Sequence, residues 1–239
     1  MKLFKKIIKI LLIAVSLLVI LFASAVLIGL YIEWEFAPKG FLFYEHGKIS
    51  QVISPYIMGF PIGLLGYWAL IKFKITTPKK TEENEETLFI WNRLGKWRIL
   101  AVLVWVIGAY CCFFDITFVT EDKIIVHTPL NPKGTEYQYS DVETIKTGFG
   151  DKTFSIYTHN EKGSFFYIIK LHGKEVVFSA PTPNTAIERY SEDSYLELED
   201  FDNALVELGI EKESSRKGYQ HCYYEKEYVD RFLRIIDRK

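Results

Sequence analysis

Three long runs without a charged residue constrain this chain more than any other feature of its sequence. They cover residues 10–32, 49–71 and 99–114, and the first contains 23 residues. A helix of that length is about 34 Å long at roughly 1.5 Å per residue, and the hydrocarbon core of a bilayer is about 30 Å thick. The runs therefore predict three transmembrane helices, over about 10–32, 50–71 and 97–114.

The first run also resembles a secretory signal peptide. Four lysines precede it, and the Ala-Ser-Ala triplet at residues 23–25 imitates a cleavage site. The apolar run continues to Ile32, well past that triplet, which a signal peptide would not need. A retained anchor is the favoured interpretation, and cleavage stays open.

The distribution of charge predicts an orientation for these helices. Residues 1–114 hold 13 Lys/Arg and 7 Asp/Glu, whereas residues 115–239 hold 16 and 23. Between the second and third runs there are seven Lys/Arg, against two between the first and second. Because basic loops stay in the cytoplasm, we expect a multi-pass protein of the cell membrane, with its N-terminus cytoplasmic and its C-terminal domain extracytoplasmic. Aromatic residues of the outer loop, such as Phe41, Phe43 and Tyr44, would then lie at the bilayer surface.

After Asp115 the sequence changes to short alternating runs separated by turn residues, which is typical of an antiparallel sheet. Two amphipathic helices follow, over 198–208 and 228–236, and the first stops at Gly209. The strands are expected at 115–120, 124–128, 135–139, 142–149, 153–158, 164–171 and 175–179. Alternation predicts these buried side chains: Ile124, Val126, Val142, Ile156, Ile168, Val176 and Phe178.

Two segments carry a resemblance to a known family. DITFVTEDKIIV begins at Asp115, and YQYSDVETI begins at Tyr137. Together they resemble the opening of the bacterial pleckstrin-homology-like (PH-like) domains that follow membrane helices. The resemblance covers about 115–210 and implies a β-barrel of about seven strands with a capping helix, acting in binding or assembly. The expected domains are thus a transmembrane region (1–114), a PH-like barrel (115–210) and a C-terminal amphipathic helix (211–239).

Few residues suggest chemistry. His221 and Glu225 have the spacing of two ligands on one helix face, but two ligands do not make a metal site. Cys222 adjoins His221, yet neighbouring residues on a helix point about 100° apart. No phosphate-binding or dinucleotide-binding motif occurs. We therefore expect no catalytic, cofactor-binding or metal-binding residues, and no enzyme activity.

Charge also restricts the partners. A nucleic-acid partner is not expected, because the C-terminal half is acidic. Phosphoinositide binding is disfavoured, because Glu121 and Asp122 occupy the turn between the first two expected strands. The preferred hypothesis is a non-enzymatic, membrane-anchored module of a bacterial envelope that is integral to the bilayer and docks a protein partner of unknown identity. The alternatives are an accessory subunit of a transporter or envelope enzyme complex, and a membrane-bound hydrolase using His221, Cys222 or Glu225.

Overall fold

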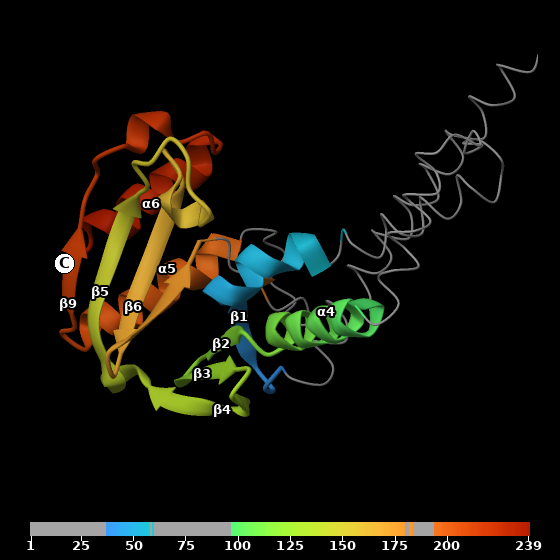
Figure 1. Ribbon diagram of the computed structural model, residues 1–239. Helices are drawn as coiled ribbons and strands as arrows, with labels where there is room; N and C mark the ends of the chain where they lie inside the picture. The colour runs from blue at the N-terminus through green and yellow to red at the C-terminus, as the bar shows by residue number, and fades with distance from the viewer. Residues whose placement is uncertain (1–36, 58, 60–96, 180–181, 184–193) are drawn as a thin grey trace, which may run out of the picture. The chain divides into compact units, whose positions relative to one another are not determined.

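The computed structural model describes residues 37–57, 59, 97–179, 182–183 and 194–239 (Figure 1). The chain divides into two compact units. Of the described residues, 53–57, 59 and 97–110 belong to the first unit, and 37–52 and 111 onwards belong to the second. The second unit contains every strand that the structure describes.

Two helical segments pack closely in the first unit. The helix α4 (Trp97–Phe113) lies against the end of a helix that covers residues 48–57. Trp105 Nε1 donates a hydrogen bond to the carbonyl oxygen of Ile57 at 2.9 Å. A Cβ atom at Gly108 would lie only 2.6 Å from Ile57 Cδ1, so glycine is needed for this close approach.

The predicted membrane helices are not supported. The third one corresponds to α4, which has only 17 residues, whereas a span needs about 20. Within the described residues, no helix combines the length and the apolar composition needed to cross a bilayer. The expected span at 10–32 lies outside the described residues, as does most of the span at 50–71. This finding overturns the predicted three-helix membrane fold, the transmembrane assignment and the multi-pass location with its two sides.

The first sheet of the second unit is antiparallel and has the order β4-β3-β2-β1-β8. Its central strand β2 is buried along its whole length. The strand β1 comes from the segment that was expected to be an outer membrane loop, and it pairs with β2 from Phe41 to His46. The strands are β1 (Phe41–His46), β2 (Ile116–Thr120), β3 (Lys123–Thr128), β4 (Asn131–Gln138) and β8 (Thr182–Pro183).

The second sheet has the order β7-β6-β5-β9. Its strands are β5 (Val142–Phe149), β6 (Phe165–Leu171), β7 (Lys174–Phe178) and β9 (Glu211–Ser214). The strand β9 pairs with β5 in parallel, whereas the other pairs are antiparallel. A two-residue turn joins β6 to β7, with positive φ at both His172 (47°) and Gly173 (79°), as a tight hairpin requires.

Two helices complete the core between the sheets. The helix α5 (Ser194–Glu207) packs against β1, and α6 (Lys226–Asp237), which lies behind β5 and β6 in Figure 1, packs against β5. Phe201 of α5 is buried and contacts aromatic rings of both sheets, whereas Phe232 of α6 is buried against rings of β5 and β6. Burial of such rings is the main contribution to the stability of a core.

The strand pattern predicted from the sequence was correct in most places and wrong in one. Residues 153–158 form no strand, and Ile156, expected in the core, is 69% exposed. Ile168 is only half-buried, because Ile169 and not Ile168 faces the core. Three strands were not predicted at all: β1, β8 and β9. The sheets are therefore larger than the seven-stranded barrel expected for 115–210, and their unit also contains residues 37–52 and α6.

The unpredicted strand β1 corrects the interpretation of its aromatic residues. Phe41, Phe43 and Tyr44 are all buried, and Phe43 lies edge-on to Phe178 and Phe201 in the core. The sequence predicted that these rings lie at a bilayer surface. In the structure they are packed in the interior of the second unit.

Candidate functional site

A cavity of about 320 Å³ lies within the second unit, between the two sheets. It is formed where β1 and β3 end, where β2 begins, and along β7. The lining residues are 45–49, 115, 117, 126–128 and 174–177.

The cavity begins where the packing of the core stops. On the core side of the first sheet, Phe43, Val119 and Ile124 form a buried row across three strands. The next row on the same face consists of Glu45, Thr117 and Val126, which line the cavity. Side chains on one face recur every second residue, so this second row continues the first one. The first row is entirely apolar, whereas two of the three residues in the second row, Glu45 and Thr117, are polar. The hydrophobic core therefore ends between these rows.

The backbone at the end of β7 shows which of its groups face the first sheet. Ser179 follows β7, and its N–H donates to Glu45 Oε2 at 3.2 Å. The Ser179 carbonyl accepts a hydrogen bond from the Tyr195 hydroxyl at 3.0 Å. Both backbone groups of Ser179 thus point away from β6. Backbone direction alternates along a strand, so those of Val177 and Glu175 point the same way.

These outward groups have no partner within the described part of the chain. The strand β7 pairs with β6 on one side only, and it is the edge of its sheet. The backbone hydrogen bonds outside the regular ladders include none to Glu175 or Val177. Both residues line the cavity. Part of the cavity wall is therefore an open strand edge that offers donors and acceptors.

The opposite wall is fixed by a helix start. Asp115 Oδ2 accepts a hydrogen bond from the Ser50 N–H at 2.9 Å, which caps the helix that begins at Lys48. Gly47 N–H donates to the Asp115 carbonyl at 2.7 Å. A Cβ atom at Gly47 would lie 2.1 Å from Asp115 Oδ1, so only glycine allows this arrangement.

One ion pair joins the two walls. Lys48 Nζ lies 3.0 Å from Glu175 Oε2, and the side chains are 39% and 58% exposed. The hydrogen bond from Lys48 lowers the pKa of Glu175. An ion pair this exposed contributes only about 0–1 kcal/mol of stabilisation, so it holds the two walls together weakly.

Two histidines nearby carry buried ring nitrogens without a partner in the described structure. His159 is buried, and its Nδ1 has no hydrogen bond to a described residue. Burial lowers its pKa, and Lys48 lowers it further. His46 lines the cavity, its Nδ1 is also unpaired, and burial lowers its pKa although Asp115 opposes this.

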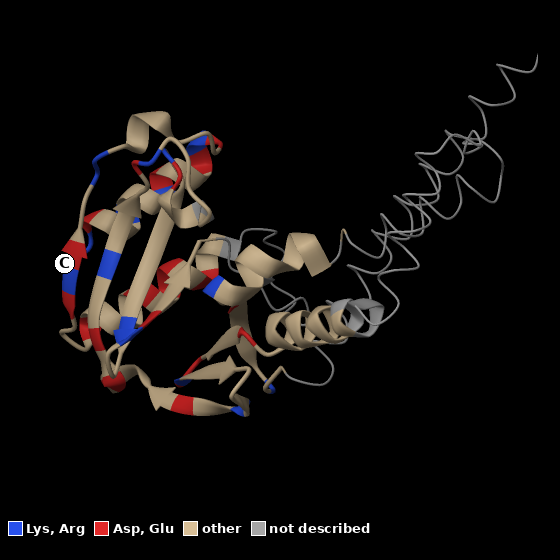
Figure 2. Cartoon of the chain, viewed as in Figure 1, with Lys and Arg blue, Asp and Glu red and all other residues tan. Residues whose placement is uncertain are grey.

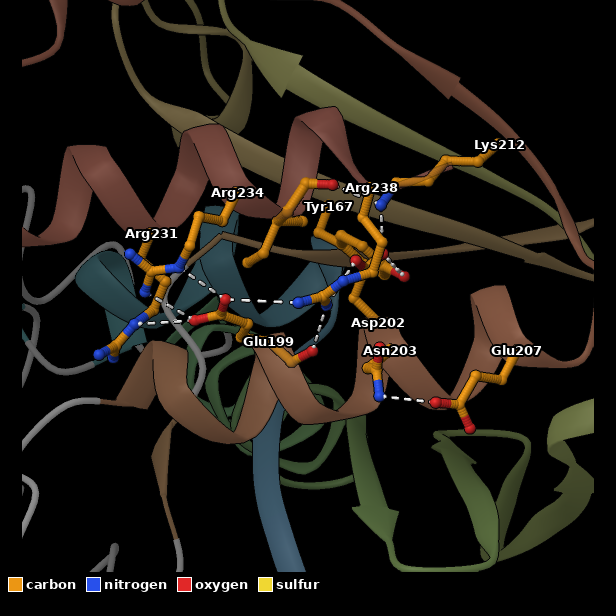
Figure 3. Close-up of polar contacts among 10 residues, drawn as sticks. Tyr167, Glu199, Asp202, Asn203, Glu207, Lys212, Arg231, Arg234 and Arg238 are labelled. Carbon is orange, nitrogen blue, oxygen red and sulfur yellow. Dashed lines mark hydrogen bonds and ion pairs between the residues drawn. The ribbon is translucent and has the colours of Figure 1, made fainter.

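The most heavily charged cluster of the unit lies elsewhere, between α5, α6 and β9 (Figure 3). Asp202 is fully buried and accepts hydrogen bonds from the Tyr167 hydroxyl at 2.9 Å and from Lys212 at 2.5 Å. Arg238 donates to the other oxygen of Asp202 at 3.1 Å. Burial lowers the pKa of Lys212, but its contact with Asp202 opposes this.

Glu199 is the second anion of this cluster. It lies 2.9 Å from Arg234, 3.2 Å from Arg231 and 3.4 Å from Arg238, as Figure 3 shows. The hydrogen bond from Arg234 lowers the pKa of Glu199. Glu199 and Asp202 lie on α5, Arg231 and Arg234 lie on α6, and Arg238 is the C-cap of α6, so the cluster holds the two helices together.

The residues considered for a hydrolase or a metal site lie at the ends of two separate helices. His221 ends a short 3-10 helix (Tyr219–His221), and Glu225 precedes α6, so the two do not share a helix face. Both side chains are exposed. Burial raises the pKa of Cys222, which opposes formation of a nucleophilic thiolate. In the described ranges, no three His, Cys, Asp or Glu side chains are grouped to hold a metal ion.

No family model, curated protein or solved structure matches this chain. The resemblance to PH-like domains therefore stays a prediction.

Sequence reasoning missed the cavity because its walls come from segments far apart in the chain. Glu45 and Lys48 lie in a segment that was assigned to the membrane region, whereas Glu175 lies in a predicted strand. One signal was present: three of the six residues of FLFYEH at 41–46 are Phe or Tyr, which are enriched in strands.

Proposed function

We propose that the second unit is a non-enzymatic binding module that docks a partner protein by accepting an extended segment of it as an added strand along β7. One observation carries this proposal: the outward backbone groups of Glu175 and Val177 lie at the wall of a cavity and have no partner among the described residues. Strand addition supplies partners for such groups, and the cavity gives room for side chains.

Another edge strand of the unit, β4 of the first sheet, provides a contrast. The strand β4 is also an edge, but it contains Pro132, Lys133 and Gly134 and is largely exposed. Proline and lysine are common protections against unwanted pairing at an edge. The strand β7 contains neither proline nor glycine, has a lysine only at its first residue, Lys174, and lines the cavity. Its edge beyond Lys174 therefore lacks these protections and is available to a segment that fits.

The size of the cavity limits what enters it. Its volume of about 320 Å³ is at the lower end of the range of ligand pockets, roughly 300–1,000 Å³. It accommodates a few side chains of an extended segment and not a folded surface. The resemblance to PH-like domains, which implies a binding or assembly module, agrees with this proposal.

The test uses the whole chain and a displayed library of random nine-residue peptides. Glu175→Pro removes an outward N–H but no hydrogen bond of the β6–β7 ladder, and proline is tolerated at such edge positions. Glu175→Ala is the matched variant, since it removes the same side chain and keeps the N–H.

We expect the library to yield peptides that bind the wild-type chain and the alanine variant, with loss of binding to the proline variant. Circular dichroism should show that both variants are folded. Peptides that bind all three proteins equally, or a library that yields no binder, would contradict docking at β7.

A further inference from the structure

The carboxylate of Glu175 lies in a cationic environment. Lys48 Nζ is 3.0 Å away, and Lys146 and His159 also act to lower the pKa of Glu175. Lys152 is close enough to His159 to lower the pKa of its ring. Glu175 is therefore held as an anion by Lys48, and the charge of Lys146 acts in the same direction.

The sheet register shows which charged residues share a face with Glu175. Lys146, Ile168 and Val177 are paired across β5, β6 and β7 on the outer face of the second sheet, and Glu213 of β9 pairs with Lys146 on the side away from β7. The neighbouring row on that face contains Lys170 and Glu175, with Glu211 at its β9 end. Figure 2 shows the corresponding blue segments in the middle of β5 and at the end of β6.

An added strand at β7 would extend both of these rows. Every second side chain of the new strand would lie on the outer face, beside Glu175 or Val177. Lys170 is already paired with Glu143 at 3.1 Å, whereas Lys48 has Glu175 as its partner. Lys48 is thus the cation that an incoming side chain meets at the rim of the cavity.

The charges close to Glu175 affect an incoming side chain more strongly than the net charge of residues 115–239 does. Residues 115–239 have seven more acidic than basic residues, which disfavours an acidic partner at long range. At physiological ionic strength this field is screened beyond about 8 Å. Lys48 Nζ, at 3.0 Å from Glu175 Oε2, lies well within that distance, so its charge acts on a side chain that enters there.

We infer that the segment docked at β7 carries an acidic side chain, which replaces Glu175 as the partner of Lys48. This inference rests on the proposed docking at β7 and adds the chemistry of the partner. In the free protein the Glu175 side chain occupies the position of the incoming carboxylate and competes with it. The Lys48–Glu175 pair is then an autoinhibitory contact that a matching segment exchanges for its own.

Two variants test this exchange. Glu175→Gln removes the competing carboxylate and keeps the shape and backbone, and Lys48→Ala removes the cation. The probes are the peptides selected from the random nine-residue library, resynthesised with each Asp or Glu replaced by Asn or Gln. Glu136→Gln is the matched control, because Glu136 lies on β4, an edge strand of the first sheet, and forms a similar exposed pair with Lys123 at 3.0 Å.

We expect Asp or Glu to be enriched at one position of the selected peptides. Affinity for these peptides should increase about two- to fivefold in Glu175→Gln, and should stay unchanged in Glu136→Gln. In Lys48→Ala the acidic peptides and their amide versions should bind equally.

Two results would contradict the inference, and the second of them would also contradict docking at β7. Peptides that bind at β7 without an acidic preference, or with a preference for Lys or Arg, would refute the exchange and leave docking intact. The absence of any peptide sensitive to Glu175→Pro would refute docking and the inference together.

Discussion

The α5–α6 cluster and the β7 cavity belong to the same unit, yet they treat polar groups in opposite ways. In the cluster, fully buried Asp202 contacts Tyr167, Lys212 and Arg238. At the cavity, the backbone of Glu175 and Val177 and the Nδ1 atom of His46 have no partner in the described structure. The two sites are both polar, but only one is saturated.

The difference separates a structural site from a binding site. A buried charge without partners is costly, so the cluster is stable only because each charge has several contacts. An open strand edge at a cavity can instead obtain its hydrogen bonds from a ligand. The α5–α6 cluster has the higher density of charge, but its charged groups contact one another. The cavity has polar groups without a described partner, so it is the better candidate for a binding site.

The largest effect should follow from breaking the saturated site. Asp202→Ala leaves Lys212, whose side chain is 4% exposed, without its anion. We expect a loss of about 3–5 kcal/mol in the free energy of unfolding, measured by urea denaturation.

A double variant separates this charge effect from lost packing. Lys212→Met in the Asp202→Ala background removes the unpaired cation and should recover a large part of the loss. Glu207→Gln is the control, because Glu207 is exposed and contacts only Asn203 in Figure 3. Equal losses in the single and double variants would contradict the assignment of the cluster.

A smaller effect is expected at the wall of the cavity. Gly47→Ala would place a Cβ atom 2.1 Å from Asp115 Oδ1 and displace the carboxylate from the Ser50 N–H. Loss of this helix cap should reduce the free energy of unfolding by about 0.5–2 kcal/mol, measured by urea denaturation. Gly59→Ala, in the same helical region but with open space around it, should not be destabilising. A Gly47→Ala variant as stable as the wild type would contradict the claim that Asp115 caps this helix at the cavity wall.

The sequence predicted the regular parts of this unit and failed where distant segments meet. The strand β5 was predicted at its observed bounds, and α5 was located by the spacing of Leu198, Phe201 and Leu205. In contrast, β1 was missed because an aromatic segment between apolar runs has the same composition as a membrane interface.

The candidate site could not be predicted from any single segment of the sequence, because it depends on how distant segments are arranged. The open edge of β7 follows from the orientation of Ser179 and from the order of strands in the sheet. Ile156 shows the opposite failure, because its alternating neighbours imitate a strand although no neighbouring strand pairs with it.

The cavity region should also make stability depend on pH. Burial lowers the pKa of His159, so the unfolded chain binds a proton more readily than the folded one. Its contribution is complete above the unfolded pKa of about 6.5 and is lost as pH falls through the lower, folded pKa. We expect the free energy of unfolding to fall from about pH 7.5 to about pH 5.5, with a shallower slope in His159→Gln. His221→Gln, at an exposed position, is the control, and equal slopes in all three proteins would refute this origin.

The smallest effect on stability should come from the Lys48–Glu175 pair. Both side chains are substantially exposed, so Lys48→Ala should change the free energy of unfolding by no more than about 1 kcal/mol. The same variant should nevertheless remove the preference for acidic peptides. A large loss of stability would instead make this pair part of the structural framework, like the α5–α6 cluster.

Amide hydrogen exchange along β7 tests the open edge most directly, by NMR on the whole chain with and without a selected peptide. The N–H groups of Val176 and Phe178 face β6, and those of Glu175 and Val177 face the cavity. We predict slow exchange at Val176 and Phe178 in both states. Exchange at Glu175 and Val177 should be fast in the free protein and slow when the peptide is bound. Slow exchange at Glu175 and Val177 in the free protein, or no change on peptide binding, would contradict an edge that accepts a strand.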